Sequence, residues 1–82
     1  MRILIVEDDE TLGLSMAQTL TNGGYATDLV GSVADALHAI SVEHFDAIVL
    51  DLGLPDRDGY EVVRSLRQRQ LTLPVLILTK NP

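Results

Sequence analysis

The sequence contains no cysteine and no tryptophan, and aromatic residues make up only 4% of it. The absence of cysteine excludes a disulfide scaffold, a thiolate zinc site and a cysteine nucleophile. The low aromatic content argues against a platform on which nucleic-acid bases stack. No apolar run approaches the roughly 18 residues of a membrane span. Only four apolar residues separate Arg2 from Glu7, so we expect no secretory signal, no membrane contact and a cytoplasmic location.

Basic residues are also scarce, with 6 Lys and Arg against 12 Asp and Glu, which gives a net charge of −6. Phosphate backbones and anionic membrane surfaces repel such a chain, so we expect no direct contact with nucleic acid. The 82 residues are 46% hydrophobic and 22% charged. That composition is typical of a globular protein, and the length allows one domain at most.

The hydrophobic pattern predicts strands that alternate with helices. Residues 3–6 form a continuous apolar run, which is typical of a strand buried on both faces, and a similar run ends at Asp51. The expected strands are Arg2–Val6, Tyr25–Val30, Phe45–Leu50 and Val75–Leu78, and the expected helices are Glu10–Asn22, Ser32–Val42 and Gly59–Gln70. This alternation predicts an α/β fold with a parallel sheet and right-handed crossovers.

Helical periodicity predicts which side chains of each helix face inward. These are Leu12, Met16, Thr19 and Leu20 in the first helix, Val33, Ala36, Leu37 and Ile40 in the second, and Tyr60, Val63 and Leu66 in the third. We expect Asp9 to help start the first helix, and Ser32 with Asp35 resembles a capping box for the second. Three helices are too few to cover both faces of four strands, so one face is expected to be partly uncovered.

Acidic residues follow two of the predicted strands. Glu7, Asp8 and Asp9 follow the first strand, Asp51 follows the third, and Thr79 follows the fourth. Ligands of open parallel sheets bind outside the carboxyl ends of the strands, so these carboxylates converge if the first and third strands are neighbours. Converging carboxylates repel one another unless a cation neutralises them, and a small set of oxygen ligands favours Mg²⁺ or Mn²⁺. A single acid would be explained as a helix cap or a solvated loop residue, but the whole group favours a metal site.

Asp51 begins the segment DLGLPDRDG. A carboxylate beside a metal can act as a nucleophile toward phosphorus, and Mg²⁺ would neutralise the phosphoryl oxygens in the transition state. A hydroxyl at Thr79 could donate a hydrogen bond to one of those oxygens, although a structural role at the strand end is an equal alternative.

Three segments together resemble the receiver domain of two-component response regulators, and their sequences are most similar to those of the OmpR/PhoB-like transcriptional regulators. The segments are RILIVEDDE at residues 2–10, VLDLGLPDRDGY at residues 49–60 and LILT at residues 76–79. The resemblance implies a flavodoxin-like (CheY-like), doubly wound parallel sheet with strand order 2-1-3-4 for the strands present here. It also implies phosphorelay signal transduction that regulates transcription, with a sensor histidine kinase as the partner.

The resemblance assigns a role to each matching residue. Asp51 is the expected phosphoacceptor and Thr79 the expected switch hydroxyl. Asp8 is the expected direct ligand of Mg²⁺ (or Mn²⁺), Glu7 a ligand through water, and the backbone carbonyl of Gly53 the third protein ligand. Such a domain accepts a phosphoryl group, and we expect no enzyme activity beyond self-catalysed phosphotransfer and dephosphorylation.

Two further surfaces follow from the resemblance. Pro55 and Gly59 are expected to shape the loop after Asp51. The kinase is expected to dock on the first helix near Leu14, Ser15 and Gln18, with an ordinary solvated helix face as the alternative at each position.

The sequence departs from the family after the fourth strand. Residues 1–82 are therefore expected to form a partial receiver domain without the last helix, strand and helix, the lysine of the fifth strand, or any DNA-binding domain. We expect Mg²⁺ binding to persist and phosphotransfer to be impaired. The uncovered sheet face and the apolar edge strand Val75–Leu78 predict a homodimer or a higher oligomer.

Three other functions were weighed against this one. A phosphatase of the haloacid dehalogenase type needs a second acid two residues after its nucleophile, where this chain has Gly53. A flavodoxin needs a hydroxyl-rich phosphate loop after the first strand, where this chain has three acids. A non-phosphorylated module that self-associates or binds other proteins remains the main alternative.

Overall fold

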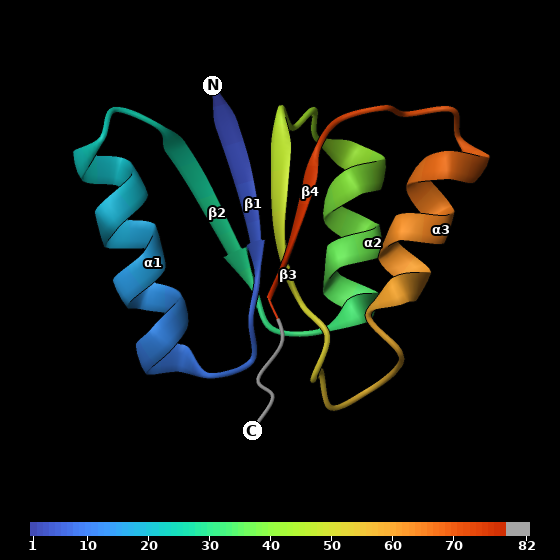
Figure 1. Cartoon of the computed structure of the whole chain (residues 1–82), viewed down its shortest axis with the longest axis horizontal. Helices are drawn as coiled ribbons and strands as arrows, with labels where there is room; N and C mark the ends of the chain where they lie inside the picture. Colours follow the sequence, from blue (N-terminus) through green and yellow to red (C-terminus); the bar gives the residue numbers. More distant parts are fainter. Residues whose placement is uncertain (79–82) are drawn as a thin grey trace.

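The computed structural model describes residues 1–78, which form a four-stranded parallel sheet flanked by three helices (Figure 1). The strands are β1 (Arg2–Val6), β2 (Ala26–Val30), β3 (Ala47–Asp51) and β4 (Val75–Leu78), and the helices are α1 (Glu10–Asn22), α2 (Val33–Val42) and α3 (Tyr60–Gln68). The strand order is β2-β1-β3-β4, and every neighbouring pair is parallel. The predicted flavodoxin-like α/β fold and the order 2-1-3-4 are confirmed.

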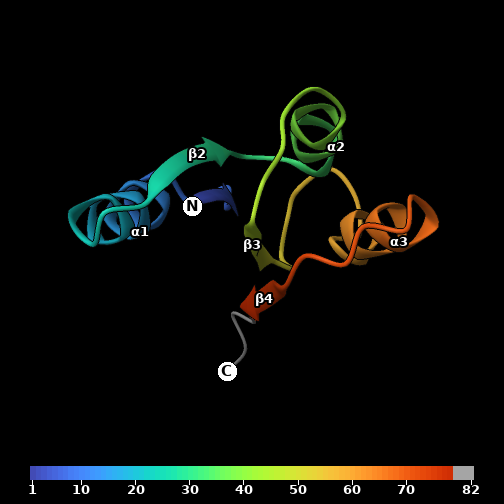
Figure 2. The ribbon, with the colours of Figure 1, turned by 90° about the horizontal axis from the view of Figure 1, so that it is seen from above.

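The helices lie on both sides of the sheet, with α2 and α3 on one side and α1 on the other (Figure 2). Alternate residues of the central strands point toward α2 and α3 and are fully or almost fully buried. This core consists of Leu4, Val6, Val33, Ala36, Ile40, Phe45, Ile48, Leu50, Val62 and Leu66. The inward positions predicted for α2 are confirmed, because Val33, Ala36 and Ile40 are buried and Leu37 packs against this core.

The opposite face of the sheet is covered less completely. The buried residue of α1 is Gly13, and a Cβ added there would lie 2.9 Å from Leu29 Cδ1 of β2. The helix backbone therefore rests directly on β2, and Ile3 and Ile5 of β1 are buried. On the edge strand β4, by contrast, the Leu76 side chain is 63% exposed. Within residues 1–78, the expected gap in the cover of the sheet is confirmed.

The predicted inward faces of two helices are wrong in part. In α3, Leu66 is buried and Val63 packs against the core as predicted, but Tyr60 is 46% exposed and Val62 is buried in its place. Tyr60 precedes Val62 by two residues, or roughly 200° around a helix, so it lies on the far side. In α1, Leu12 is 39% exposed and Thr19 is exposed too, because the contact of Gly13 with β2 turns their side of the helix away from the sheet, whereas Met16 and Leu20 are half-buried.

The ends of some elements also differ from the predicted ones. The second strand begins at Ala26, one residue later than predicted, and the third spans Ala47–Asp51 instead of Phe45–Leu50. Phe45 is nevertheless buried, since it packs in the core just before β3. Gly24 ends the α1 region with a φ of 95°, a conformation that glycine adopts without steric cost.

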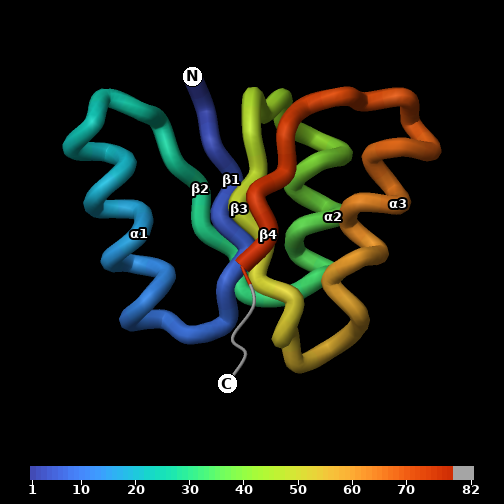
Figure 3. The backbone as a smooth tube through the Cα atoms, in the orientation of Figure 1, coloured from blue at the N-terminus to red at the C-terminus, as the bar shows by residue number. Residues whose placement is uncertain are grey.

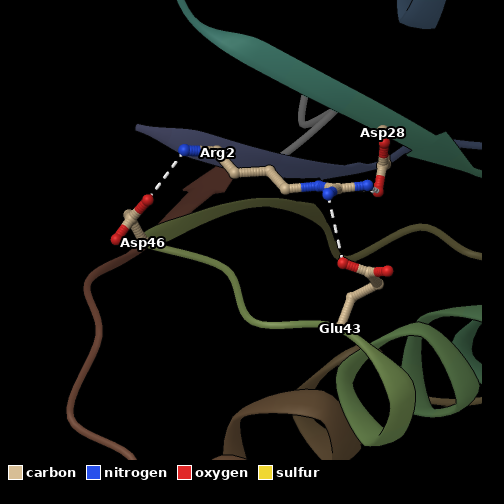
Figure 4. Close-up of polar contacts among 4 residues, drawn as sticks. All are labelled: Arg2, Asp28, Glu43 and Asp46. Carbon is tan, nitrogen blue, oxygen red and sulfur yellow. Dashed lines mark hydrogen bonds and ion pairs between the residues drawn. The ribbon is translucent and has the colours of Figure 1, made fainter.

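Polar contacts around Arg2 join the amino-terminal ends of the strands (Figure 4). The guanidinium pairs with Asp28 of β2 at 2.8 Å and with Glu43, the C-cap of α2, at 3.1 Å. The backbone N–H of Arg2 donates to Asp46 Oδ2 at 2.7 Å, just before β3. The hydrogen bond with Asp28 raises the pKa of the Arg2 guanidinium further above its already high ordinary value. Because these ion pairs are half-exposed, they add little to the free energy of unfolding, and their main effect is to align the ends of the strands.

None of the helices in residues 1–78 combines the length and the apolar character that crossing a bilayer requires.

The burial of α3 predicts unequal effects of two substitutions. Leu66→Ala removes a fully buried side chain, and we expect it to lower the free energy of unfolding by about 2–5 kcal/mol. Tyr60→Ala changes an exposed side chain, and we expect a change within about 0.5 kcal/mol. Urea denaturation monitored by circular dichroism measures both values. Equal losses in the two variants would contradict the observed orientation of α3.

Candidate functional site

The parallel register of β1 and β3 places two acids at one edge of the sheet. Val6 lies opposite Leu50, so Glu7 and Asp51 come next in each strand at the same level. The Glu7 N–H donates to Val30 O at 2.9 Å, which extends the pairing with β2 by one residue. The connections that leave β1, β2 and β3 all lie at this lower edge of the molecule in Figures 1 and 3.

Three carboxylates form a cluster at this edge. Glu7, Asp8 and Asp51 each contribute a carboxylate oxygen, and these oxygens all lie within 4.8 Å of one another. Glu7 and Asp51 are buried, whereas Asp8 is exposed. Octahedral Mg²⁺ holds oxygen ligands at about 2.0–2.1 Å, which places them roughly 3–4 Å apart. A cluster of this size and composition can therefore hold a small divalent cation, which would offset the repulsion among the three charges.

Backbone amides orient two of these carboxylates. The Asp9 N–H donates to Glu7 Oε2 at 3.0 Å, and the Gly53 N–H donates to Asp51 Oδ1 at 3.0 Å. Asp9 itself accepts a hydrogen bond from the Leu12 N–H at 3.1 Å and is the N-cap of α1. The prediction that Asp9 helps start the first helix is confirmed.

The loop between β3 and α3 folds back on the end of β3. A Cβ added at Gly59 would lie 3.1 Å from Asp51 O and 3.2 Å from Leu52 Cα. A side chain at this position would therefore fit only if these backbone atoms moved by a few tenths of an ångström. Leu52 and Leu54 pack against the hydrophobic core, so apolar contacts also hold the first part of the loop.

Asp56, in the middle of this loop, caps a helix that lies far away in the sequence. Its Oδ1 accepts from the Val33 N–H at 3.0 Å, and its Oδ2 accepts from the Ala34 N–H at 3.1 Å. These backbone hydrogen bonds, the one from Val33 above all, lower the pKa of the Asp56 carboxyl below its ordinary value. This role of Asp56 was not predicted from the sequence, because its partners are 22 and 23 positions away and leave no local pattern.

The expected cap of α2 at Ser32 is present. The Asp35 N–H donates to Ser32 Oγ at 3.1 Å, and the Ala36 N–H donates to Ser32 O at 3.0 Å. Ser32 Oγ and Asp56 together accept hydrogen bonds from the first three amides of α2, those of Val33, Ala34 and Asp35, which have no acceptors inside the helix.

The structure brings together most of the predicted site residues. Glu7, Asp8 and Asp51 converge, and Gly53 contacts Asp51. Thr79 lies outside the described residues. On α1, the residues predicted to meet a kinase are exposed, with Leu14 at 56%.

An open groove of about 350 Å³ lies between the ends of α2 and α3, away from the acids. Its floor contains Ile40, Phe45 and Leu66, and its rim contains Glu43 and Asp46. None of the three clustered acids lines it, so the chemistry of the acids does not depend on this groove.

Comparisons with known proteins agree with this geometry. The model of the response regulator receiver domain family matches residues 3–82. The chain is 46% identical over 79 residues to the transcriptional regulatory protein BasR of Escherichia coli K12, a match that covers 96% of this chain and 36% of BasR. It thus spans about a third of that relative's length.

Solved structures are similar over the whole chain. A CheY-like receiver domain from Methylobacillus flagellatus has a TM-score of 0.90 at 34% identity, with 99% of this chain and 70% of that chain covered. The BeF₃-activated receiver domain of Klebsiella pneumoniae RstA has a TM-score of 0.90 at 30% identity, with 100% and 69% covered.

The lowered pKa of Asp56 predicts a pH-dependent contribution to stability. The ionised carboxylate is favoured in the folded state, so its contribution is fully present above the ordinary pKa of 3.8 and is lost as the pH falls through the lowered value. We expect wild type to be more stable than Asp56→Asn at pH 7, and the difference to shrink as the pH falls below 3.8.

Urea denaturation between pH 7 and pH 2.5 measures this difference. Ser32→Ala is the matched control, because it removes a cap of the same helix that does not ionise. The difference between wild type and Ser32→Ala should stay constant over this range. A constant difference for Asp56→Asn as well would show that Asp56 contributes no ionic cap.

Proposed function

Because the chain belongs to the response regulator receiver domain family and its curated relatives are OmpR/PhoB-like regulators, we propose that it accepts a phosphoryl group on Asp51. The proposed role is phosphorelay signalling that regulates transcription. The observation that carries this proposal is the convergence of Glu7, Asp8 and Asp51 at the carboxyl ends of the central strands. Asp51 is buried at the base of the cluster, and Asp8 is exposed at its rim.

The chemistry of the cluster fits a magnesium ion. Under this proposal Asp8 and Asp51 bind the ion directly, the Gly53 carbonyl contributes a third ligand, and Glu7 acts through a water molecule. Bound Mg²⁺ supplies positive charge that neutralises the oxygens of the transferred phosphoryl group. Three acidic side chains with only oxygen donors suit Mg²⁺ or Mn²⁺ better than metals that prefer nitrogen or sulfur.

Asp51 is the proposed nucleophile. A carboxylate oxygen of Asp51 forms a bond to phosphorus as the phosphorus–nitrogen bond of a kinase phosphohistidine breaks. The electron pair of the broken bond leaves with the imidazole nitrogen, so the phosphoryl group moves without oxidation or reduction. The Gly53 N–H, 3.0 Å from Asp51 Oδ1, keeps the carboxylate oriented during this step.

The proposed hydroxyl at Thr79 would donate a hydrogen bond to a phosphoryl oxygen. The acyl phosphate would be lost again by self-catalysed hydrolysis rather than by turnover of a separate substrate.

The proposed partner is a sensor histidine kinase that docks on α1. Leu14, Ser15 and Gln18 are exposed there, and Leu14 presents an apolar side chain to solvent. We further propose that residues 1–82 form the first part of a receiver domain in the cytoplasm. The relatives that are named as transcriptional regulators extend well beyond the matched region, and the net charge of −6 makes direct DNA contact by this chain unfavourable.

Self-association is a second candidate function, and the β4 edge favours it. In the sheet formed by residues 1–78, β4 pairs with β3 on one side and forms the edge on the other. Leu76 and Ile77 are exposed on this strand. An apolar sheet edge readily pairs with a second copy of the same strand, so we propose a homodimer or a higher oligomer through β4.

Phosphorylation tests the leading proposal. The chain is incubated with acetyl phosphate and Mg²⁺, and its intact mass is measured. We expect one phosphoryl increment on wild type, none on Asp51→Ala, and none on wild type when EDTA removes the cation. Circular dichroism verifies that both proteins are folded.

The Asp58→Ala variant controls for the loss of one acid from the same loop, because Asp58 caps α3 through the Tyr60 N–H. It should be phosphorylated like wild type. An increment that persists in Asp51→Ala would refute Asp51 as the acceptor, and a folded wild type that gains no mass would leave self-association as the supported function.

Light scattering over a range of protein concentrations tests self-association. We expect the average mass of wild type to rise with concentration and Leu76→Lys to remain monomeric, because a lysine on an edge strand opposes strand pairing. Leu14→Lys places the same charge on exposed α1 and should behave like wild type. A wild type that stays monomeric at every concentration excludes this candidate.

A further inference from the structure

Asp56 connects the loop that follows one acid of the cluster to a second element of the fold. It belongs to the β3–α3 loop, which follows Asp51, and its carboxylate accepts hydrogen bonds from Val33 and Ala34 at the start of α2. Asp58, two residues later in the same loop, caps its own helix α3 through the Tyr60 N–H. The loop therefore has one acid with a local role and one that reaches across to another element.

The start of α2 lies in turn against the end of β1. The Glu7 N–H donates to Val30 O at 2.9 Å. A Cβ added at the next residue, Gly31, would lie 3.9 Å from Glu7 O and 4.0 Å from Asp8 Cα. Val30, at the end of the strand that leads into α2, is thus hydrogen-bonded to the backbone of Glu7, next to Asp8.

These contacts form a continuous path from one side of the acid cluster to the other. The path runs from the β3–α3 loop through Asp56 to the first turn of α2, and from there back along the chain to Val30, whose carbonyl accepts from the Glu7 N–H. The ends of β1 and β3 are held together by strand pairing as far as Val6 and Leu50. The loop that follows Asp51 is not part of this pairing. Asp56 adds a polar connection between this loop and α2 to the apolar contacts of Leu52 and Leu54 with the core.

We propose that Asp56 is a positioning residue for the cation site: it holds the β3–α3 loop, with Gly53, at a fixed distance from Glu7 and Asp8. The proposal rests on the metal-dependent function proposed above. Mg²⁺ requires near-ideal octahedral geometry, so small changes in the spacing of its ligands weaken binding. A carboxylate suits this task because the amino-terminal end of a helix carries partial positive charge and offers two amides to its two oxygens.

A purely structural role as a cap of α2 makes a different prediction. If Asp56 only caps α2, a substitution that removes another capping hydrogen bond from the same helix should weaken Mg²⁺ binding as much as Asp56→Ala does. Ser32→Ala removes a hydrogen bond from the same first turn without touching the β3–α3 loop. Asp58→Ala removes one negative charge from that loop without touching α2. Ser32→Ala therefore controls for the loss of a helix cap, and Asp58→Ala controls for the loss of a negative charge.

Calorimetric titration with Mg²⁺ gives the first measurement. We expect Asp56→Ala to weaken binding about 10-fold or more, the effect usual for residues that support metal ligands. Ser32→Ala and Asp58→Ala should weaken it less than about 2-fold, since salt screens the loss of an exposed charge. Asp56→Asn keeps one acceptor oxygen and should give an intermediate affinity. Equal affinities in all four variants would overturn the proposal.

Amide hydrogen exchange by NMR, without divalent cation, gives the second measurement. The Asp9 and Gly53 amides donate to Glu7 and Asp51, so their exchange reports on the order of the two sides of the cluster. We expect faster exchange at both amides in Asp56→Ala and at neither in Ser32→Ala. Faster exchange confined to Val33 and Ala34 would show that Asp56 only caps α2. If Asp56→Ala does not fold, Asp56→Asn replaces it in both measurements.

The two measurements separate failure of this proposal from failure of the proposed function. A wild type that binds no Mg²⁺ contradicts the metal-dependent function, whereas the exchange experiment still decides whether Asp56 positions the loop. A wild type that binds Mg²⁺ as tightly as Asp56→Ala contradicts the positioning role alone.

Discussion

The hydrogen-bonded register between β1 and β3 is the contact on which the whole site depends. It sets Val6 opposite Leu50, so the acids that follow the two apolar runs emerge side by side. A slip of one residue would turn every side chain of the strand to the other face and separate the acids from one another. The Arg2 cluster secures the same register at the opposite edge, where Arg2 N–H donates to Asp46 Oδ2 and Asp46 N–H donates to Arg2 O at 2.8 Å. Alignment at one end of the strand pair thus determines the geometry of the acids at the other end.

Much of this arrangement can be predicted from the sequence, because the relevant signals are local and strong. Uninterrupted apolar runs that end in an acid mark β1 and β3, since strands buried on both faces have no alternation. The alternation of strands with helices predicts the parallel sheet, and the family resemblance gives its order. From these two facts the convergence of Glu7, Asp8 and Asp51 follows without coordinates. The cap at Ser32 was also predictable, because its partner amide lies only three residues away.

Other features depend on distances that a sequence does not contain. The rotation of a helix about its axis depends on what it packs against: Gly13 rests on Leu29, and this contact leaves Leu12 exposed. In α3 the buried residues are Val62 and Leu66, because these side chains pack into the core beside those of α2. Asp56 was missed for a related reason. Its role becomes visible only when the loop after β3 and the start of α2, 22 residues apart in sequence, are seen in contact.

The central position of β1 has a consequence for how the chain acquires its structure. The first strand to be synthesised lies in the interior of the sheet, yet its partners begin only at Ala26 and Ala47. Parallel pairings between such distant segments form late, because loop closure opposes them until the new contacts compensate. During that interval the apolar residues 3–6 are exposed to aggregation. One of the strands that pair with them is β3, which ends in Asp51. The pairing that protects one side of β1 is therefore also the pairing that brings Asp51 beside Glu7 and Asp8.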